Sequence, residues 1–70
     1  MATHKPYKPG DRVWLRSFWD GNVYIPYEEG EVQGDEDNGV YLVEVDDQYL
    51  DGPDDDGLRE VPTEQIGGLL

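Results

Sequence analysis

The apolar residues of this chain occur in short runs, and each run is closed by a cluster of Gly, Pro, Asn or Asp residues. In residues 12–16 the side chains alternate, with Val13 and Leu15 on one face and polar or aromatic residues on the other. This period of two is typical of a half-buried strand, because successive side chains of a strand point to opposite faces. No stretch repeats its apolar residues at helical spacing over three turns, so we expect an all-β fold.

Four to five short strands are expected between the turn clusters. The best is the run 40–45, which is rich in β-branched and aromatic residues and is apolar on both faces. We therefore expect a central strand buried on two sides. The Asn38-Gly39 pair before it predicts a hairpin, because both residues tolerate positive φ. The other expected strands are residues 12–16, 30–33 and 58–61, with a short edge strand at 48–50.

Residues 17–29 predict a long, partly ordered first loop with an extended piece at residues 23–25. Asp20-Gly21-Asn22 is a turn cluster, and Pro26 cannot donate a hydrogen bond to a strand ladder. The loop concentrates aromatic side chains, so it is the first place to look for an exposed binding surface.

The end of the chain predicts a single helical turn over residues 62–66, which Thr63 can cap and from which Ile66 points back to the core. The chain is short enough to form one domain over residues 1–70, and we expect residues 1–6 and 67–70 to be flexible. The expected core consists of Val13, Leu15, Ile25, Val32, Leu42, Val45, Leu58, Val61 and Ile66.

The charge is strongly negative and unevenly distributed. The chain has 17 acidic and 5 basic residues in 70, and four of the basic residues precede residue 28. Such a surface repels nucleic acid and anionic lipid, so we expect neither as a direct partner and expect a basic protein surface instead. Without a long apolar run or a basic leader followed by an apolar segment, the chain is expected to be a cytoplasmic protein.

The residue types needed for catalysis or metal binding are scarce. The chain has no cysteine, one histidine (His4) and one serine (Ser17), and His4 lies in residues 1–6, which we expect to be flexible. The acidic loops at residues 35–39 and 51–57 offer oxygen ligands, but neither register of the second loop fits the ligand spacing of an EF-hand. We expect no enzyme activity, no metal and no cofactor.

A family resemblance covers residues 7–66. The segment Tyr7-Lys8-Pro9-Gly10-Asp11-Arg12-Val13-Trp14-Leu15 resembles the opening of SH3-like small β-barrels, among them retroelement integrase C-terminal domains and Tudor and agenet domains. The later segments 30–32, 41–45 and 61–66 are similar to the strands and the closing helical turn of these barrels. The resemblance implies a small five-stranded SH3-like barrel with a long first loop and a single helical turn before the last strand. The integrase domains are basic and bind DNA, and this chain departs from them in charge.

We expect a non-catalytic acidic interaction module that docks a basic protein surface or peptide. The acids would supply a negative field that speeds encounter, and aromatic residues would anchor the partner at short range. Adjacent elements of a small barrel are expected to bring the acids of residues 28–37 and 51–56 onto one side. The expected partner-binding residues are Trp19, Tyr24, Tyr27, Glu28, Glu29, Glu31, Asp35, Glu36, Asp37, Asp54, Asp55 and Asp56.

Two further functions are compatible with the same residues. Dense carboxylates on a compact barrel can imitate the phosphates of duplex DNA, as in viral-type inhibitors of DNA-binding or defence proteins. The resemblance to Tudor domains implies methyl-lysine reading, in which aromatic rings enclose the cation. The rings available for a cage, or alternatively for the core, are Trp14, Trp19, Tyr24, Tyr27, Tyr41 and Tyr49. The acidity can also serve only solubility or a saline environment.

Overall fold

The computed structural model describes residues 6–34 and 36–70, and within them the fold is all-β, as the sequence predicts. The helical content of these residues is two 3-10 turns, η1 (Asp47–Tyr49) and η2 (Thr63–Gln65). The described residues contain no helix with the length and apolarity to cross a lipid bilayer. The strands are β1 (Arg12–Leu15), β2 (Phe18–Asp20), β3 (Val23–Ile25), β4 (Glu28–Val32), β5 (Val40–Val45), β6 (Leu58–Pro62) and β7 (Ile66–Leu69).

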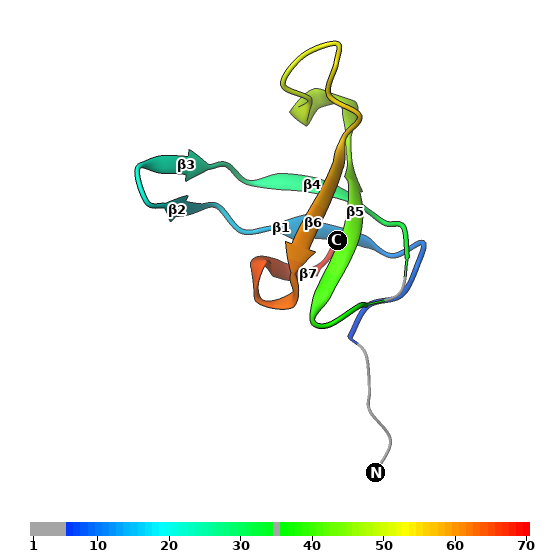
Figure 1. The fold of residues 1–70 in the computed structure, drawn as a ribbon. Helices are drawn as coiled ribbons and strands as arrows, with labels where there is room; N and C mark the ends of the chain where they lie inside the picture. Colours follow the sequence, from blue (N-terminus) through cyan, green and yellow to red (C-terminus); the bar gives the residue numbers. More distant parts are fainter. Residues whose placement is uncertain (1–5, 35) are drawn as a thin grey trace.

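Five strands form one antiparallel sheet in the order β6-β5-β4-β1-β7. The sheet curls into a half-barrel, with β5 and β6 running steeply across the direction of β1 and β4 (Figure 1). Strands β2 and β3 form a separate two-stranded hairpin that projects from the end of β1 and β4 (Figure 1). The extended piece expected at residues 23–25 is β3, but its pairing with β2 corrects the expectation of a partly ordered loop at residues 17–29. The turn of the hairpin comes at the Asp20-Gly21-Asn22 cluster, and Pro26 follows the second strand.

The inner face of the half-barrel carries the core, and β5 shows how the alternation works. Tyr41, Val43 and Val45 are buried, whereas Leu42 is 39% exposed and Glu44 is exposed. The expectation that residues 40–45 are buried on both faces is therefore wrong. A curled antiparallel sheet has one concave face to fill, and its other face meets solvent.

The observed core differs from the expected one because only one face of β5 is buried. It contains Val13, Leu15, Val32, Tyr41, Val43, Val45, Val61 and Ile66. Leu42 and Leu58 are exposed on the outer face, and Ile25 is only half-buried because it belongs to the hairpin. Tyr41 takes the central place, and its ring meets Tyr7 edge-on with centroids 5.6 Å apart. Tyr7, which precedes β1, is thereby partly buried against the core.

Three local expectations near the end of the chain are corrected. Residues 47–49 form a 3-10 turn where a short edge strand was expected at 48–50. Thr63 does not cap the turn η2; its hydroxyl donates to the Gly39 carbonyl oxygen at 3.0 Å. The expected flexible end at residues 67–70 belongs largely to β7, which pairs with β1. Ile66 does reach the core, as predicted.

The turn before β5 has the conformation that the sequence predicts. Asn38 and Gly39 both have positive φ, at 54° and 82°, and Asp37 pairs with Val40 across the turn. The Glu36 carboxylate also accepts the Gly39 N–H at 3.1 Å. The Asn-Gly pair thus forms the tight hairpin turn predicted from its tolerance of the left-handed region.

Candidate docking groove

A groove of about 300 Å³ lies where the β2–β3 hairpin meets β6 and the loop that precedes it. Its apolar lining comes from Leu15, Phe18, Ile25, Pro26 and Val61. Its polar lining comes from Asp20, Glu28, Asp51, Arg59, Glu60 and Gln65. The groove therefore combines an apolar floor with a polar rim in which acidic side chains outnumber basic ones, and this combination is typical of a binding site that fixes the orientation of its ligand.

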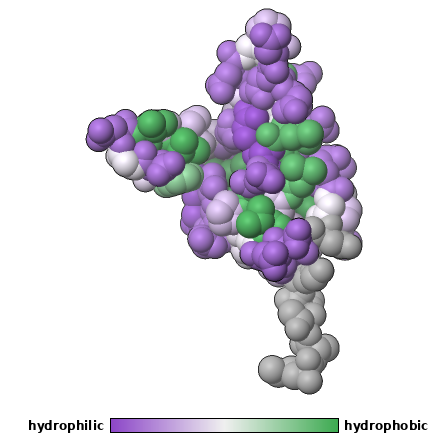
Figure 2. All heavy atoms as spheres, in the orientation of Figure 1, coloured by the Kyte–Doolittle hydropathy of each residue, from purple (hydrophilic) through white to green (hydrophobic). Residues whose placement is uncertain are grey.

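The hairpin places one of its two faces toward this groove. Phe18 pairs with Ile25 and Asp20 pairs with Val23, so these four side chains share one face. Phe18, Asp20 and Ile25 line the groove. The half-barrel supplies the opposite wall, because Leu15 and Val61 project from the inner face of β1 and β6. Figure 2 shows apolar surface on the projecting hairpin and hydrophilic surface over the loop that follows β5.

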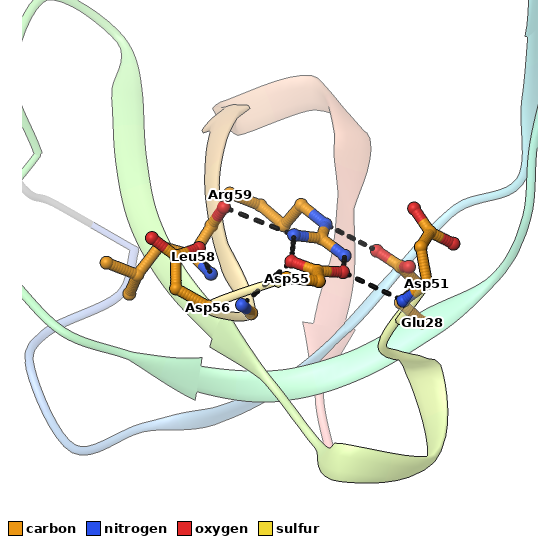
Figure 3. A network of polar contacts seen from close by, with 7 residues as sticks. Glu28, Asp51, Asp55, Asp56, Leu58 and Arg59 are labelled. Atoms are coloured by element: carbon orange, nitrogen blue, oxygen red, sulfur yellow. Dashed lines mark hydrogen bonds and ion pairs between the residues drawn. The ribbon is translucent and has the colours of Figure 1, made fainter. Parts of the chain in front are cut away.

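Among the described residues that line the groove, Arg59 is the one basic residue, and an internal carboxylate holds it. Arg59 donates two hydrogen bonds from its terminal nitrogens to the Asp55 carboxylate, at 2.9 and 2.8 Å. Asp55 also accepts the backbone N–H groups of Asp51 and Gly57, each at 2.9 Å. Figure 3 shows Arg59 between Asp55 on one side and Glu28 on the other. The hydrogen bonds from Arg59 hold the pKa of Asp55 well below its usual range, and those from the backbone lower it further.

Glu28 is the second carboxylate beside Arg59, and it is less well satisfied. It lies opposite Leu15 on the inner face of β4 and is 9% exposed. Its Oε1 is 3.5 Å from Arg59 Nε. Burial raises the pKa of Glu28, and the attraction of Arg59 offsets this only in part. Two carboxylates thus share one guanidinium, and Asp55 holds the better geometry.

The rim acids add to this negative charge. Asp20, Asp51 and Glu60 are exposed, and within residues 6–34 and 36–70 none of them forms an ion pair. The groove therefore presents net negative charge around an apolar floor. A ligand with a positive charge and an apolar body complements both properties.

The expected aromatic anchors lie outside the groove. Trp19 and Tyr24 pair on the other face of the hairpin, 68% and 51% exposed, with ring centroids 5.2 Å apart. Tyr27 stacks on Trp14 with centroids 6.0 Å apart, and its hydroxyl donates to Glu29 at 2.6 Å. That hydrogen bond raises the pKa of Tyr27 to about 12.

The Trp14–Tyr27 pair is part of the outer surface of the sheet. Trp14 covers Gly67, where a Cβ atom would collide with the indole ring. Arg16 lies over the same indole, 5.4 Å from the ring centroid. The rings of Trp14 and Tyr27 are stacked with an interplanar angle of 25°, and Arg16 occupies a position over the indole.

Glu28 and Asp55 meet at Arg59, but the two acidic loops do not lie on one side as expected. Asp37 adjoins the first residue of β5, whereas the loop with Asp54, Asp55 and Asp56 leads into β6 opposite the last residues of β5. The two acidic loops therefore lie at opposite ends of β5 (Figure 1). Asp35 lies outside the described residues, as does His4.

Several of these acids also have local structural roles. Asp56 accepts the Leu58 N–H at 3.0 Å, and Glu36 accepts the N–H of the hairpin turn. Glu31 faces Glu44 across β4 and β5 on the outer face. Within the described part of the chain, no group of three or more His, Asp or Glu side chains has an arrangement that could hold a metal ion.

The groove residues that the sequence interpretation missed are Asp20, Arg59 and Glu60 together with the apolar wall, whereas Asp51 was expected only as part of the acidic loop at residues 51–56. One signal was present: Arg59 is the only basic residue of the sequence after residue 27, so it was the natural partner for nearby carboxylates. The hairpin wall had no such signal, because it depends on the pairing of β2 with β3.

Comparison with protein-family models, with curated proteins and with solved structures finds no significant match for this chain. Its function is therefore inferred from the geometry and charge of the groove.

Proposed function

We propose that this protein is a non-catalytic interaction module that docks a basic segment of a partner protein in the groove between the β2–β3 hairpin and β6. One observation carries the proposal: the cation of the groove, Arg59, is bound to Asp55, and this leaves three rim acids without an ion pair among the described residues. An incoming lysine or arginine side chain would supply the missing positive charge.

The apolar floor gives such a segment a second source of affinity. Phe18, Ile25 and Pro26 are apolar, keep accessible surface and lie among the charged residues of the groove. Apolar contact at the floor supplies short-range binding energy, and the acidic rim steers the encounter and selects for positive charge. The groove is open to solvent, so a side chain of the segment can enter it.

The architecture behind this proposal is an SH3-like barrel. Its support is the strand order β6-β5-β4-β1-β7, the excursion of β2 and β3 between β1 and β4, and the 3-10 turn η2 directly before β7. These features correspond to the long first loop and the closing helical turn that the resemblance implies. Small barrels of this kind serve many functions, so the docking function is argued from the groove and not from the fold.

The proposal is tested with a labelled peptide of alternating lysine and valine, whose binding is followed by fluorescence anisotropy at about 50 and about 200 mM salt. The groove variant combines Asp20→Asn, Asp51→Asn and Glu60→Gln. The matched control combines Asp37→Asn, Glu44→Gln and Asp47→Asn, which removes the same charge from exposed residues outside the groove.

We expect the groove variant to weaken binding about tenfold or more and to flatten its salt dependence. The control is expected to change affinity by less than about threefold, because screened charges at a distance contribute little. Equal losses in both variants would mean that the peptide responds to net charge alone, and the groove would then not be the docking site.

A further inference from the structure

Glu28 differs from the other acids of the groove because it is buried. The groove's rim acids are exposed, whereas Glu28 lies on the inner face of β4 with 11% of its side chain accessible. A buried carboxylate is costly unless a partner satisfies it. Its partner here is Arg59, and the contact is a single approach of 3.5 Å to Nε.

Arg59 makes two short contacts with Asp55 and one longer contact with Glu28. Both terminal nitrogens of Arg59 are already engaged with the two Asp55 oxygens. Asp55 in turn is held by two backbone N–H groups, so the Arg59–Asp55 pair is anchored to the loop. Figure 3 shows Asp55 at the terminal nitrogens of Arg59 and Glu28 beside its Nε. The contact of Arg59 with Glu28 is therefore the longer of its two carboxylate contacts.

The surroundings of Glu28 fit a long side chain with a cationic end. Phe18, Ile25 and Pro26 line the same groove and keep accessible apolar surface. Lysine and arginine bury their methylene stems against apolar surface while the charged end finds a polar partner. In the groove, apolar surface lies beside the Glu28 carboxylate, so the stem and the charged end of such a side chain would each have a matching surface.

We infer that Glu28 receives the charged end of one lysine or arginine side chain of the docked segment, with the stem of that side chain against Phe18, Ile25 and Pro26. This inference rests on the proposed docking function and deepens it. Glu28 is then the residue that selects a cation at the floor, and the rim acids act on the segment as a whole.

The titration of Glu28 supports this assignment. Burial raises its pKa, Asp51 and Asp55 raise it further by repulsion, and Arg59 lowers it. The acids Asp20 and Glu60 face the same groove. A cation bound beside Glu28 favours the charged carboxylate, so binding is expected to lower this pKa.

The experiment titrates the full chain with three capped tripeptides, Ac-Val-Lys-Val-NH2, Ac-Val-Arg-Val-NH2 and the acetyl-lysine form of the first. Binding is followed through the backbone amide signals in nuclear magnetic resonance spectra. We expect saturable shifts at Phe18 and Ile25 with the lysine peptide, the arginine peptide or both, and at least tenfold weaker binding of the uncharged acetyl-lysine peptide.

Two variants separate Glu28 from general charge. Glu28→Gln keeps the shape of the side chain and is expected to weaken binding of the charged peptides at least tenfold. Glu44→Gln removes an exposed carboxylate from the outer face of β5 and is expected to change affinity less than twofold. A second readout needs no variant: the pKa of Glu28, followed through its carboxyl carbon signal, is expected to fall when the lysine or arginine peptide is bound.

Two results would overturn the inference, and they differ in what they imply for the proposed function. If Glu28→Gln binds as well as the parent and the Glu28 pKa does not move, while the rim variant still loses affinity, the docking function stands and Glu28 is only structural. If the peptides shift signals over the whole acidic surface without saturation, both the inference and the docking groove are wrong.

Discussion

The half-barrel and the β2–β3 hairpin are built from similar residues but are stabilised very differently. Each strand of the half-barrel pairs within one sheet and buries an inner face against a shared core. The hairpin has one pairing and no buried residue, and Phe18, Trp19, Val23 and Tyr24 are all at least 40% exposed. A two-stranded hairpin alone is marginally stable in water. Its exposed apolar residues therefore contribute little to the stability of the fold and are available for contact with a partner.

The largest expected effect is in the core of the half-barrel. Tyr41→Ala removes its largest fully buried side chain and should lower the free energy of unfolding by about 3–5 kcal/mol. The adjacent Leu42→Ala should cost less than about 1 kcal/mol, because Leu42 lies on the outer face. Chemical denaturation measures both. Similar losses at the two positions would contradict the one-sided burial of β5.

The next effect concerns the outer face of the half-barrel, where Trp14 lies on Gly67. Gly67→Ala would place a methyl group where the indole ring now packs, and we expect a loss of about 1–3 kcal/mol with a red shift of tryptophan emission. Gly34→Ala is the control, because no atom lies near the site of its added methyl group. If Gly67→Ala leaves stability unchanged, Trp14 is as loosely held as the hairpin aromatics.

Acid titration tests how much the ion pairs of Asp55 with Arg59 and of Asp46 with Arg12 stabilise the fold. The pKa of Asp55 is lowered from an ordinary value of 3.8, so the carboxylate stabilises the fold above about pH 4 and this contribution is lost as the pH falls further. Asp46, whose pKa is lowered by Arg12, acts in the same direction. We expect Asp55→Asn to reduce the melting temperature at pH 7 and to flatten its decrease below about pH 4.

The charge of Glu28 should affect the stability of the fold with the opposite sign. Its pKa is raised in the fold, so its charge opposes folding at neutral pH, and this unfavourable contribution disappears as the pH falls through the raised pKa. Glu28→Gln is therefore expected to keep or increase the melting temperature at pH 7. A lower melting temperature at pH 7 would mean that the attraction to Arg59 outweighs burial.

The smallest expected effect on stability is in the hairpin. Trp19→Ala removes a side chain that is 68% exposed and should change the free energy of unfolding by less than about 0.5 kcal/mol. Hydrogen exchange should show the amides of β2 and β3 opening far more often than those of β5. If Trp19→Ala lowered the free energy of unfolding as much as Gly67→Ala, the hairpin would have to unfold cooperatively with the half-barrel.

The sequence predicts the fold class well, and its errors have identifiable causes. Period two in residues 12–16 and the Asn38-Gly39 turn are local signals, and the structure confirms both. In residues 40–45 nearly every side chain is apolar or aromatic, so alternation could not be recognised; Glu44 was the one residue that marked the outer face. β7 contains two glycines and has no strand propensity of its own, and its pairing depends on β1 and on the cover of Trp14.

The candidate site was less predictable than the fold. Glu28 and Asp55 were among the expected partner-binding residues and both belong to the network around Arg59. The groove itself joins side chains of β1, the hairpin, β4 and β6, and only the pairing of distant strands brings these together. Trp19, Tyr24 and Tyr27 were identified by composition alone, which does not indicate the face on which a side chain lies.

The pairing of β1 with β7 has a consequence for how the chain acquires its structure. Val13 pairs with Leu69, and the Leu70 N–H donates to the Arg12 carbonyl oxygen at 2.9 Å, so the sheet joins segments from near the two ends of the chain. Closing such a long loop has an entropic cost, which slows folding relative to proteins dominated by local contacts. During synthesis the edge of β1 remains without its second neighbour until residues 66–69 have left the ribosome. Until then the nascent chain exposes a strand edge beside a partly formed core, which is the interval in which it is most open to aggregation or to capture by a chaperone.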